Sequence, residues 1–471
     1  MVNETYTGTQ VNRYASHSLV YLSTCLLIYF IIGIQYAALT PAWQVPDEPA
    51  HYNFIKHIAQ TGSLPELKKG DYDQNYLARL TSEKFPPDLS VDSVRYESWQ
   101  PPLYYILATP IFLIFNGALL PLRVFSLLIG AGVIVFAYLA VNEAISNLQS
   151  PISNLQPPTS NLQPLIAVAF IAFIPQHIAM MAGVNNDSLS ELIIAIGLWR
   201  ILVMSNEPSA MSNSSFVIRH LSLGILLGLA LITKSHAYLL APVALVMLLL
   251  RWRSNLQSPI SNLQSLILVF LPAFLIGSTF WIRNLYVYGA PDFMATIRHD
   301  SVVIGQPRTS EWITQYGTLE VARRFFQTTF QSFWGQFGWM GVVMDQRVYI
   351  ALMIFSVLLV IGFIIAISRQ PSAISNQQSP IFNHQSLILT ISFLLTLALY
   401  LYYNLNYVQH QGRYLFPALI PLSVAVSLSL TTWADMFKFL GDKRKWLAFV
   451  PIVMMAVLCV FALYRFIIPA L

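Results

Sequence analysis

Long apolar stretches, separated by short polar segments, recur along almost the whole chain. A helix that crosses a bilayer needs about 20 mostly apolar residues. Eleven runs of about this length cover residues 18–39, 119–141, 164–182, 188–205, 217–236, 237–251, 265–286, 348–368, 386–404, 414–432 and 446–466. The pattern predicts an all-α integral membrane protein with about eleven transmembrane helices. The first run is too long for a signal peptide and has no cleavage site after it, so we interpret it as a span.

A shorter apolar stretch, residues 103–116, follows the sequence Trp99-Gln100-Pro101-Pro102. It is too short for a comfortable span, and we predict a surface or re-entrant helix here. The alternative is a span with a Pro-Pro start, which would move every later loop to the other side of the membrane. Tyr104, near its start, is a candidate substrate-binding residue.

Basic residues indicate which side of the membrane each loop occupies. One set of alternating loops carries Arg200, Arg219, Arg251, Arg253, Arg369 and residues 443–445. Because cytoplasmic loops are enriched in Lys and Arg, this set is placed inside, with residues 1–17 as a cytoplasmic N-terminal tail. The string SNLQSPISNLQ occurs at 146–156 and 254–264, with a degraded copy at 375–381. All three copies fall in these loops, and their polar composition predicts disordered linkers.

The predicted outer loops are longer than the inner ones. Residues 40–118 form a first outer region, rich in acids and with amphipathic surface helices, and residues 287–347 form a second, rich in aromatic residues. Long irregular loops in compact proteins are usually functional. We therefore divide the chain into a catalytic membrane module (18–286), the aromatic outer loop (287–347) and C-terminal transmembrane helices (348–471), with the chemistry on the extracytoplasmic face.

Composition narrows the functional class. The chain is 56% hydrophobic and only 10% charged, whereas a soluble domain carries roughly 25% charged residues. This excludes an ordinary cytosolic enzyme, a disordered protein and a nucleic-acid binder. The net charge of +5, from 26 Lys and Arg against 21 Asp and Glu, reflects scarce charge rather than a basic surface for DNA. The two cysteines provide neither a disulfide framework nor zinc-ligand spacing.

The segment Pro46-Asp47-Glu48-Pro49-Ala50-His51 follows the first span directly. Pro49 suits the first turn of a helix, apolar residues recur after it at helical spacing, and Gly62 is a natural stop. We predict an amphipathic helix on the membrane surface, with Asp47 and Glu48 at its positive N-terminal end. Ionised carboxylates there suit a base or a cation ligand. Capping is the favoured role for Glu48, and function is favoured for Asp47.

Two further polar residues are expected near Asp47. His51 lies one turn away and can ligate a cation or orient the carboxylate, although a solvated interfacial histidine is the simpler interpretation. Asp187 follows two asparagines in a predicted outer loop. It can bring a second carboxylate to the same pocket, or merely cap the helix that starts at Ser188.

Three cations, Lys234, Arg283 and Arg413, fall on the predicted outer side. Charges at the edge of hydrocarbon usually face a cavity or a partner, and Arg can bind phosphate through a bidentate fork. Snorkelling to the interface is the alternative for each. Trp334 lies in a run of aromatics and glycines that offers planes for a sugar ring or a lipid chain, or forms an ordinary aromatic belt.

The order of these motifs resembles the GT-C superfamily of polytopic glycosyltransferases, which includes protein O-mannosyltransferases and aminoarabinose and rhizobial lipopolysaccharide transferases. Within it, the chain is most similar to an uncharacterised bacterial membrane-protein family. The similar segments, spread over about residues 18–430, are 46–51, 186–188, Lys234, 281–284, 332–335, 337–339 and 411–417.

The resemblance implies a polyprenyl-phosphate-linked sugar donor in the bilayer and transfer to a hydroxyl of a glycan, lipid or protein acceptor on the outer side. It maps the catalytic first-loop acid onto Asp47, with Glu48 as the neighbour that could share or replace it. We expect no counterpart of the large soluble C-terminal domain of some relatives, so acceptor recognition is expected from the loops or a partner.

In the resulting hypothesis Asp47 is the general base, a role worth about 10²–10⁴-fold, and transfer inverts the anomeric carbon. Arg283, Arg413 and Lys234 neutralise the departing phosphate. The sequence has no Gly-rich phosphate loop. The one cofactor considered is a divalent cation between Asp47 and Asp187 or His51, and any other metal ligands are unknown.

Three alternatives remain from the sequence. A lipid or solute transporter or flippase would carry charges near the bilayer midplane and repeats of spans. A non-catalytic scaffold would tolerate neutralising Asp47 and Arg413. A polysaccharide polymerase or ligase would place its main outer loop late in the chain.

Overall fold

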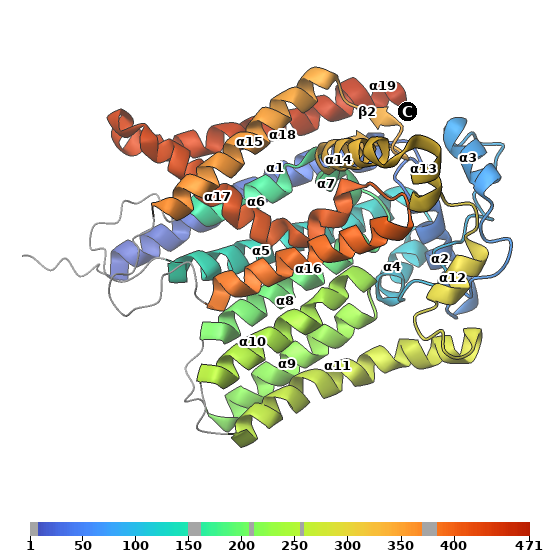
Figure 1. Cartoon of the computed structure of the whole chain (residues 1–471), viewed down its shortest axis with the longest axis horizontal. Helices are drawn as coiled ribbons and strands as arrows, with labels where there is room; N and C mark the ends of the chain where they lie inside the picture. The colour runs from blue at the N-terminus through green and yellow to red at the C-terminus, as the bar shows by residue number, and fades with distance from the viewer. Residues whose placement is uncertain (1–7, 149–161, 207–211, 255–258, 370–383) are drawn as a thin grey trace, which may run out of the picture.

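Long helices run side by side through the molecule and short helices gather at one end (Figure 1). The computed structural model describes residues 8–148, 162–206, 212–254, 259–369 and 384–471. In that part of the chain, ten helices are long and apolar enough to cross a membrane, or up to eleven if a bent pair forms one span. The predicted all-α polytopic membrane fold is therefore confirmed.

The membrane-length elements follow the predicted spans in order. They are α1 (Gly8–Leu39), α5 (Leu119–Leu148), α8 (Asp187–Asn206), α9 (Asn213–Leu231), η2 (Ser235–Leu239) with α10 (Leu240–Ser254), α11 (Pro259–Tyr288), α15 (Gln346–Ser368), α16 (His384–Asn406), η4 (Gly412–Ala418) with α17 (Leu419–Met436), and η5 (Lys438–Phe449) with α18 (Val450–Ala462), η6 (Leu463–Ile467) and α19 (Ile468–Ala470).

The bent pair consists of α6 (Gln163–Ala172) and α7 (Pro175–Met181), which meet at 66°. Proline has no N–H to continue the helix and pushes the residue before it into an extended conformation. Ile174 accordingly has ψ 118°. The break therefore follows from Pro175, and it turns α7 toward the crowded end of the molecule.

Some predicted boundaries differ from the structure. Helix α1 begins at Gly8, inside the predicted tail, and α11 begins at Pro259, so the second half of the repeat at 254–264 is helical rather than a linker. The Pro at the first helical position and the apolar run that follows explain this helix start. Residues 149–156, 255–258 and 375–381 of the repeats lie outside the described residues.

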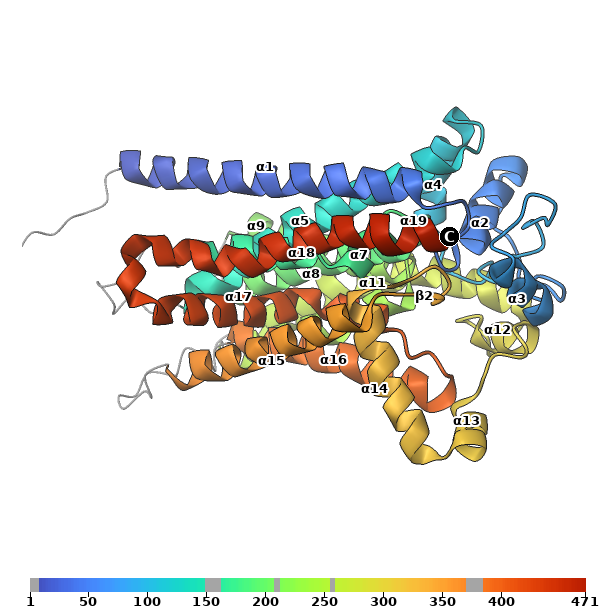
Figure 2. The same cartoon turned by 90° about the horizontal axis from the view of Figure 1, so that it is seen from above.

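Short elements occupy the end of the molecule where α7 and α11 finish. They are α2 (Glu48–Thr61), α3 (Gln74–Ser82), α4 (Leu103–Ile114), α12 (Thr296–Val302), α13 (Thr309–Tyr316), α14 (Thr318–Trp334), and the antiparallel pair β1 (Gln336–Phe337) and β2 (Val342–Val343). Figures 1 and 2 both show α2, α3, α12 and α13 together at this end, which we call the capped end. The segment 287–347 is thus not a plain loop, since helices fill most of it.

Helix α2 has the predicted bounds for the predicted reasons. Pro49 lies in its first turn, and Gly62 ends it with the left-handed φ of 69° that glycine adopts at little cost. Its apolar face is buried, and the ring of Phe54 stacks on Tyr105 of α4 at 3.7 Å. The short apolar stretch 103–116 is therefore a helix of 12 residues, and α2 covers it.

The two outer segments of the chain pack against each other. The Tyr288 hydroxyl accepts a hydrogen bond from the Leu67 N–H at 3.0 Å, and Trp339 Nε1 donates to the Trp43 carbonyl at 2.9 Å. A small second core joins them and includes Leu80, Phe85, Val94, Tyr96 and Val303. This core holds the first outer segment in a fixed position over the helix ends.

Candidate active site

Asp47 lies immediately before α2 in a left-handed conformation, with φ 67°. Such a φ is unfavourable for a non-glycine residue, by about 1–3 kcal/mol, and such strain is concentrated at functional sites. Its side chain does not cap the helix. Instead Oδ1 accepts a hydrogen bond from the Tyr96 hydroxyl at 2.6 Å, and Oδ2 accepts one from Arg413 Nη2 at 2.7 Å.

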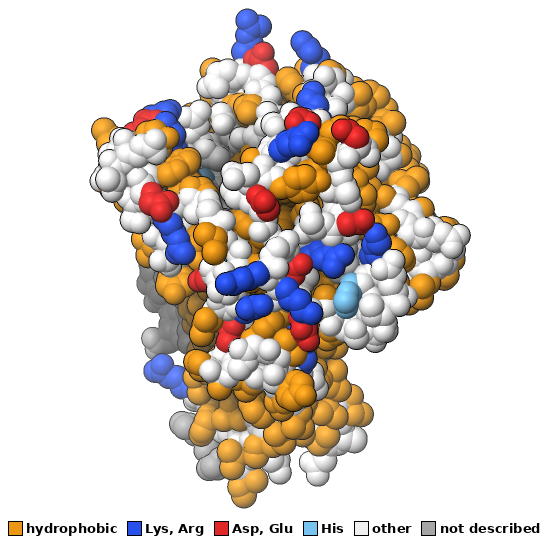
Figure 3. All heavy atoms as spheres, turned by 90° about the vertical axis from the view of Figure 1, so that its right-hand side faces the viewer, with side chains coloured by type: hydrophobic (Ala, Val, Ile, Leu, Met, Phe, Trp, Pro, Cys, Tyr) orange, Lys and Arg blue, Asp and Glu red, His pale blue; other side chains and the backbone are white. Residues whose placement is uncertain are grey.

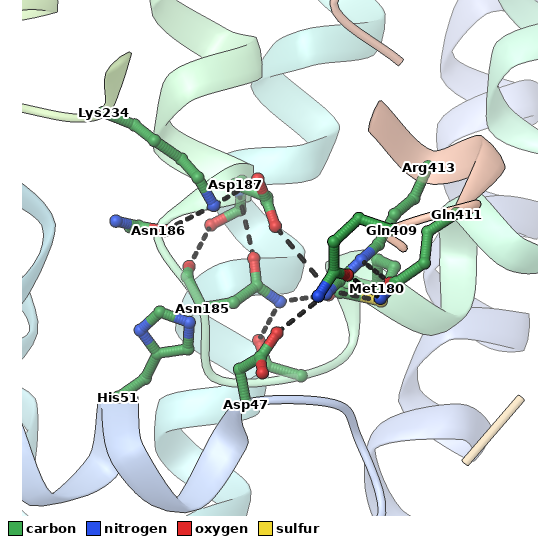
Figure 4. A network of polar contacts seen from close by, with 12 residues as sticks. Asp47, His51, Met180, Asn185, Asn186, Asp187, Lys234, Gln409, Gln411 and Arg413 are labelled. Atoms are coloured by element: carbon green, nitrogen blue, oxygen red, sulfur yellow. Dashed lines mark hydrogen bonds and ion pairs between the residues drawn. The ribbon is translucent and has the colours of Figure 1, made fainter. Parts of the chain in front are cut away.

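Arg413 connects two carboxylates that are far apart in the sequence. Besides its bond to Asp47, its Nη1 lies 4.0 Å from Oδ2 of Asp187, and its Nε donates to Gln411 Oε1 at 2.7 Å. Its side chain is only 8% exposed. The guanidinium therefore lies between Asp47 and Asp187, as Figure 4 shows.

Asp187 is the first residue of α8, and Lys234 lies between α9 and η2. Lys234 Nζ donates to Asp187 Oδ1 at 2.6 Å and to Asn186 Oδ1 at 2.9 Å. The expected capping role falls to Asn185, whose Oδ1 accepts from the Ser188 N–H at 3.3 Å. Asp47, Arg413, Asp187 and Lys234 thus form one group, which we call the charged cluster.

The surrounding side chains determine the protonation states of Asp47, just before α2, and of His51, in its first turns. Burial raises the pKa of Asp47, but Arg413 and the Tyr96 hydroxyl outweigh this and hold it below its ordinary value. His51 lies beside Asp47 (Figure 4), and its Nδ1 contacts the Tyr105 hydroxyl at 2.9 Å. Burial and the charge of Lys234 lower the pKa of His51 to about 3. At neutral pH, Asp47 is therefore ionised and His51 is uncharged.

The charged cluster remains in contact with solvent. The Asp47 side chain is 25% exposed and that of Asp187 is 20% exposed. Figure 3 views the capped end, over which acidic and basic side chains are spread among apolar ones. A small pocket adjoins the cluster and is lined in part by Gln44, Pro46 and Met180. Met180 Sδ lies 3.8 Å from Arg413 Nη1, so the pocket and the cluster share a wall.

Glu48, the neighbour of Asp47, faces a different part of the molecule. It is fully buried, and its two oxygens accept hydrogen bonds from Arg123 at 2.8 and 2.6 Å. The backbone N–H groups of Trp43 and Val184 also donate to it. These bonds indicate a structural role that ties α2 to α5 and to the turn before α8, rather than a share in the chemistry of Asp47.

Three other predicted residues have partners away from the charged cluster. Arg283 donates to Asn284 Oδ1 at 3.1 Å and to the Pro65 carbonyl, so it joins α11 to the first outer segment. The Tyr104 hydroxyl bonds to Ser126 Oγ at 2.7 Å inside the core. Trp334 is 3% exposed and packs edge-on against other aromatic rings. Trp334 therefore presents no open face to a sugar, nor does it form an interfacial belt.

The structure adds residues that were not among the predicted site residues. Tyr96 bonds Asp47, Asn186 bonds Lys234, and Glu97 lies close enough to Asp47 and Lys234 to interact electrostatically. Burial raises the pKa of Glu97 to about 7, and the negative charge of Asp47 adds to this. In the sequence Glu97 is one of nine acids in residues 40–100, and no spacing distinguishes it.

The divalent cation considered from the sequence does not fit this arrangement. The position between Asp47 and Asp187 is filled by the guanidinium of Arg413, and His51 faces Tyr105. Over the described ranges of the chain, no three His, Cys, Asp or Glu side chains are grouped so that they could hold a metal ion. We therefore derive no step through a metal.

No family model and no curated protein sequence matches this chain. Several solved structures are similar to it. The oligosaccharyltransferase of Archaeoglobus fulgidus in complex with Zn and sulfate has a TM-score of 0.51 at 14% identity, over 92% of this chain and 52% of that one. The same enzyme tethered with an acceptor peptide containing the NVT sequon gives 0.52 at 12% identity, over 93% and 55%. ArnT from Cupriavidus metallidurans bound to undecaprenyl phosphate gives 0.49 at 13% identity, over 96% and 73%.

The two oligosaccharyltransferase structures, with TM-scores above 0.5, show a shared fold. This agrees with the fold that the resemblance to the GT-C superfamily implies. The chain spans about half the length of the oligosaccharyltransferase, at 52% and 55% in the two structures.

Proposed function

We propose that this chain, which has the GT-C fold, is a membrane glycosyltransferase that moves a sugar from a polyprenyl-phosphate-linked donor to an acceptor hydroxyl. One observation carries the proposal. Asp47 from the first outer segment and Arg413, 366 positions later, are in direct contact beside the Asp187–Lys234 pair, at the solvent-facing end of the helices. A carboxylate beside preorganised cations suits displacement of a phosphate by a hydroxyl.

The donor class follows from what surrounds the charged cluster. Arg413 and Lys234 suit the phosphate. The lipid chain would lie between the apolar spans, because the pocket beside Met180 has room for little more than water. A phosphate on a lipid places its charge at the membrane edge and its chain among apolar side chains. The sugar and the acceptor are not specified by these contacts.

In the proposed reaction Asp47 accepts the proton of the attacking hydroxyl. The bond from the anomeric carbon to the phosphate oxygen breaks on the opposite face, so the configuration inverts. The lowered pKa of Asp47 keeps it ionised and able to accept a proton at neutral pH. Tyr96 and Arg413 fix the direction of the carboxylate, so little reorganisation is needed as the transition state forms.

The active face is proposed to be extracytoplasmic. Lys234 in the charged cluster precedes η2 and α10, while Arg251 and Arg253 lie in the last turn of α10, at its far end. Lys and Arg are enriched on the cytoplasmic side. The capped end therefore faces away from the cytoplasm.

A transporter is the less well supported alternative. Its charges would lie near the middle of the spans, but Lys234 lies between α9 and η2 and Arg283 lies in the last turns of α11. Both cations are thus at helix ends on the side of the charged cluster, which favours an enzyme.

The test is D47N in membranes supplied with radiolabelled undecaprenyl-phosphate-linked glucose, galactose or mannose, each offered separately. We expect transfer to fall by about 10²–10⁴-fold, because the amide cannot accept the proton. The matched control is D92N, since Asp92 is an exposed acid of the same outer segment that pairs with Lys56. Equal transfer by D47N and the wild type would remove the proposed base.

A further inference from the structure

Glu97 interacts with the charged cluster electrostatically, and its carboxyl group has one hydrogen-bonding neighbour, Gln100, and one oxygen without a partner in the described part of the chain. Within the described residues, its Oε2 is buried and makes no hydrogen bond, and the same is true of Trp99 Nε1, two residues further on. Fourteen such atoms occur in the described residues, and Glu97 is distinguished by its neighbours. Tyr96 donates to Asp47, and Gln100 accepts from Asn186 Nδ2 at 3.3 Å, so this stretch lies against the charged cluster, where a ligand can complete it.

Several titratable groups lie close enough to Glu97 to interact with it electrostatically. They are Asp47 before α2, Asp187 of α8, Lys234 before η2, Tyr96 of the same segment, Tyr105 of α4 and Tyr403 of α16. Burial and the charge of Asp47 raise the pKa of Glu97 to about 7, while the pKa of Asp47 is lowered. Around neutral pH the site therefore contains one carboxyl that retains its proton and one that has lost it.

The charge of the cluster shows why such a proton is needed. Asp47 pairs with Arg413 and Asp187 pairs with Lys234, so these four side chains sum to zero while Glu97 and His51 are neutral. A sugar linked to a lipid phosphate carries one negative charge on a phosphodiester. When its bond to the sugar breaks, a phosphate monoester with a second negative charge forms. Both cations of the cluster are already neutralised by carboxylates, so this second charge needs another partner.

We propose that Glu97 is a second catalytic carboxyl, which donates a hydrogen bond and then its proton to the phosphate oxygen that leaves the sugar. The inference rests on the proposed function and deepens it. Pairs of carboxyl groups with opposite protonation states are the usual arrangement for an acid and a base in one site.

The bond between the anomeric carbon and the phosphate oxygen breaks, its electron pair stays on that oxygen, and the oxygen takes the proton of Glu97. The acceptor oxygen bonds to the anomeric carbon and gives its proton to Asp47. Glu97 is then ionised and Asp47 protonated, and the transfer of one proton from Asp47 to Glu97 through solvent restores the site.

The first experiment measures binding of undecaprenyl phosphate alone to the purified full chain between pH 6 and 9. The wild type is compared with E97Q and with E83Q, a control because Glu83 is an exposed acid of the same outer segment. Above pH 7 we expect Kd to rise about tenfold per pH unit in the wild type and E83Q, since binding requires the Glu97 proton. E97Q should lack this rise, and the same slope in all three proteins would overturn the proposal.

The second experiment measures transfer from the lipid-linked hexoses. We expect E97Q to lower kcat by about 10²–10⁴-fold with little change in KM, and E97D, which keeps an acid, to recover part of it. Full activity of E97Q alongside an inactive D47N would overturn the role of Glu97 and leave the proposed function standing. Absence of transfer by the wild type with every hexose would count against the proposed function, while the slope of Kd with pH still decides the role of Glu97. If E97Q elutes as an aggregate in size-exclusion chromatography, E97D takes its place in both measurements and is expected to show a shifted pH dependence.

Discussion

Two adjacent acids, Asp47 and Glu48, have different roles. Asp47 contacts Arg413, whereas Glu48 pairs with the buried Arg123. Glu48 is 0% exposed and its partner Arg123 is 3% exposed. Arg123 also donates to the carbonyls of Ala37 and Thr40 at 2.9 and 2.6 Å, at the end of α1. This buried pair ties the start of α2 to α1 and α5, and it thereby holds Asp47 in its left-handed conformation with the carboxylate toward Arg413.

Replacing Arg123 tests this role. R123M leaves the Glu48 carboxylate buried without its cation, so we expect a loss of about 3–5 kcal/mol of stability, measured by denaturant unfolding of the purified protein in detergent. The control is K56M, which breaks the exposed Lys56–Asp92 pair and should cost less than about 1 kcal/mol. Similar losses in the two variants would contradict a structural role for the buried pair.

The position of Arg413 depends on how closely η4 approaches α14. The Gly412 N–H donates to Ser332 Oγ at 2.7 Å. A Cβ at Gly412 would lie 2.3 Å from the carbonyl oxygen of Thr329 and 2.4 Å from the backbone nitrogen of Phe333. Only glycine allows this contact between the two backbones, and the contact directs the next side chain, Arg413, toward Asp47.

Replacing Gly412 by alanine should therefore act through Arg413. G412A forces η4 away from α14, and a misplacement of about 1 Å in a catalytic group can cost about 10²-fold in rate. We expect a loss of that order in transfer from a lipid-linked hexose, with the protein still folded by size-exclusion chromatography. G341A is the control, because nothing lies within 4 Å of its added Cβ. Equal activity of the two variants would show that η4 does not need this approach.

In the whole molecule, the site forms where the helix ends meet the two outer segments. Asp47 and Glu97 come from the first segment, Asp187 and Lys234 from helix ends, and Arg413 from η4. The outer segments bury part of this region. The pKa of Asp47 is nevertheless lowered, whereas the pKa of Glu97 is raised. Asp47 has a strong cationic partner and Glu97 does not. The pH dependence of folding follows from this difference.

Stability should have a maximum in mildly acidic conditions. The pKa of Glu97 is raised from 4.5 to about 7, so its contribution is fully present below pH 4.5 and is lost as the pH rises through 7. The pKa of Asp47 is lowered from 3.8, so its contribution is present above pH 3.8 and is lost as the pH falls through the folded value. We expect Tm in detergent to fall between pH 4.5 and 7.5 in the wild type and in E83Q, and to fall less in E97Q. An equal fall in all three would contradict the raised pKa.

The sequence by itself determined the membrane fold, because a bilayer requires long uninterrupted apolar helices whatever their partners are. The bounds of α2 were predictable for the same kind of reason, since Pro49 and Gly62 act on their own backbone. Local chemistry also identified Asp47 and Arg413 as candidate site residues. The contact between them joins positions 366 residues apart, and the sequence alone could not establish it.

Only the tertiary structure showed that Asp47 and Glu48 have different surroundings, and only it placed Glu97 near the charged cluster. The direction of each carboxylate depends on one left-handed turn, and the protonation of Glu97 depends on which side chains surround it. The same holds for Trp334, whose ring is buried although its sequence context resembles an exposed aromatic surface. Hydropathy and helix signals act over a few neighbouring residues, whereas burial and charge at a site are set by segments that meet only after the chain has folded.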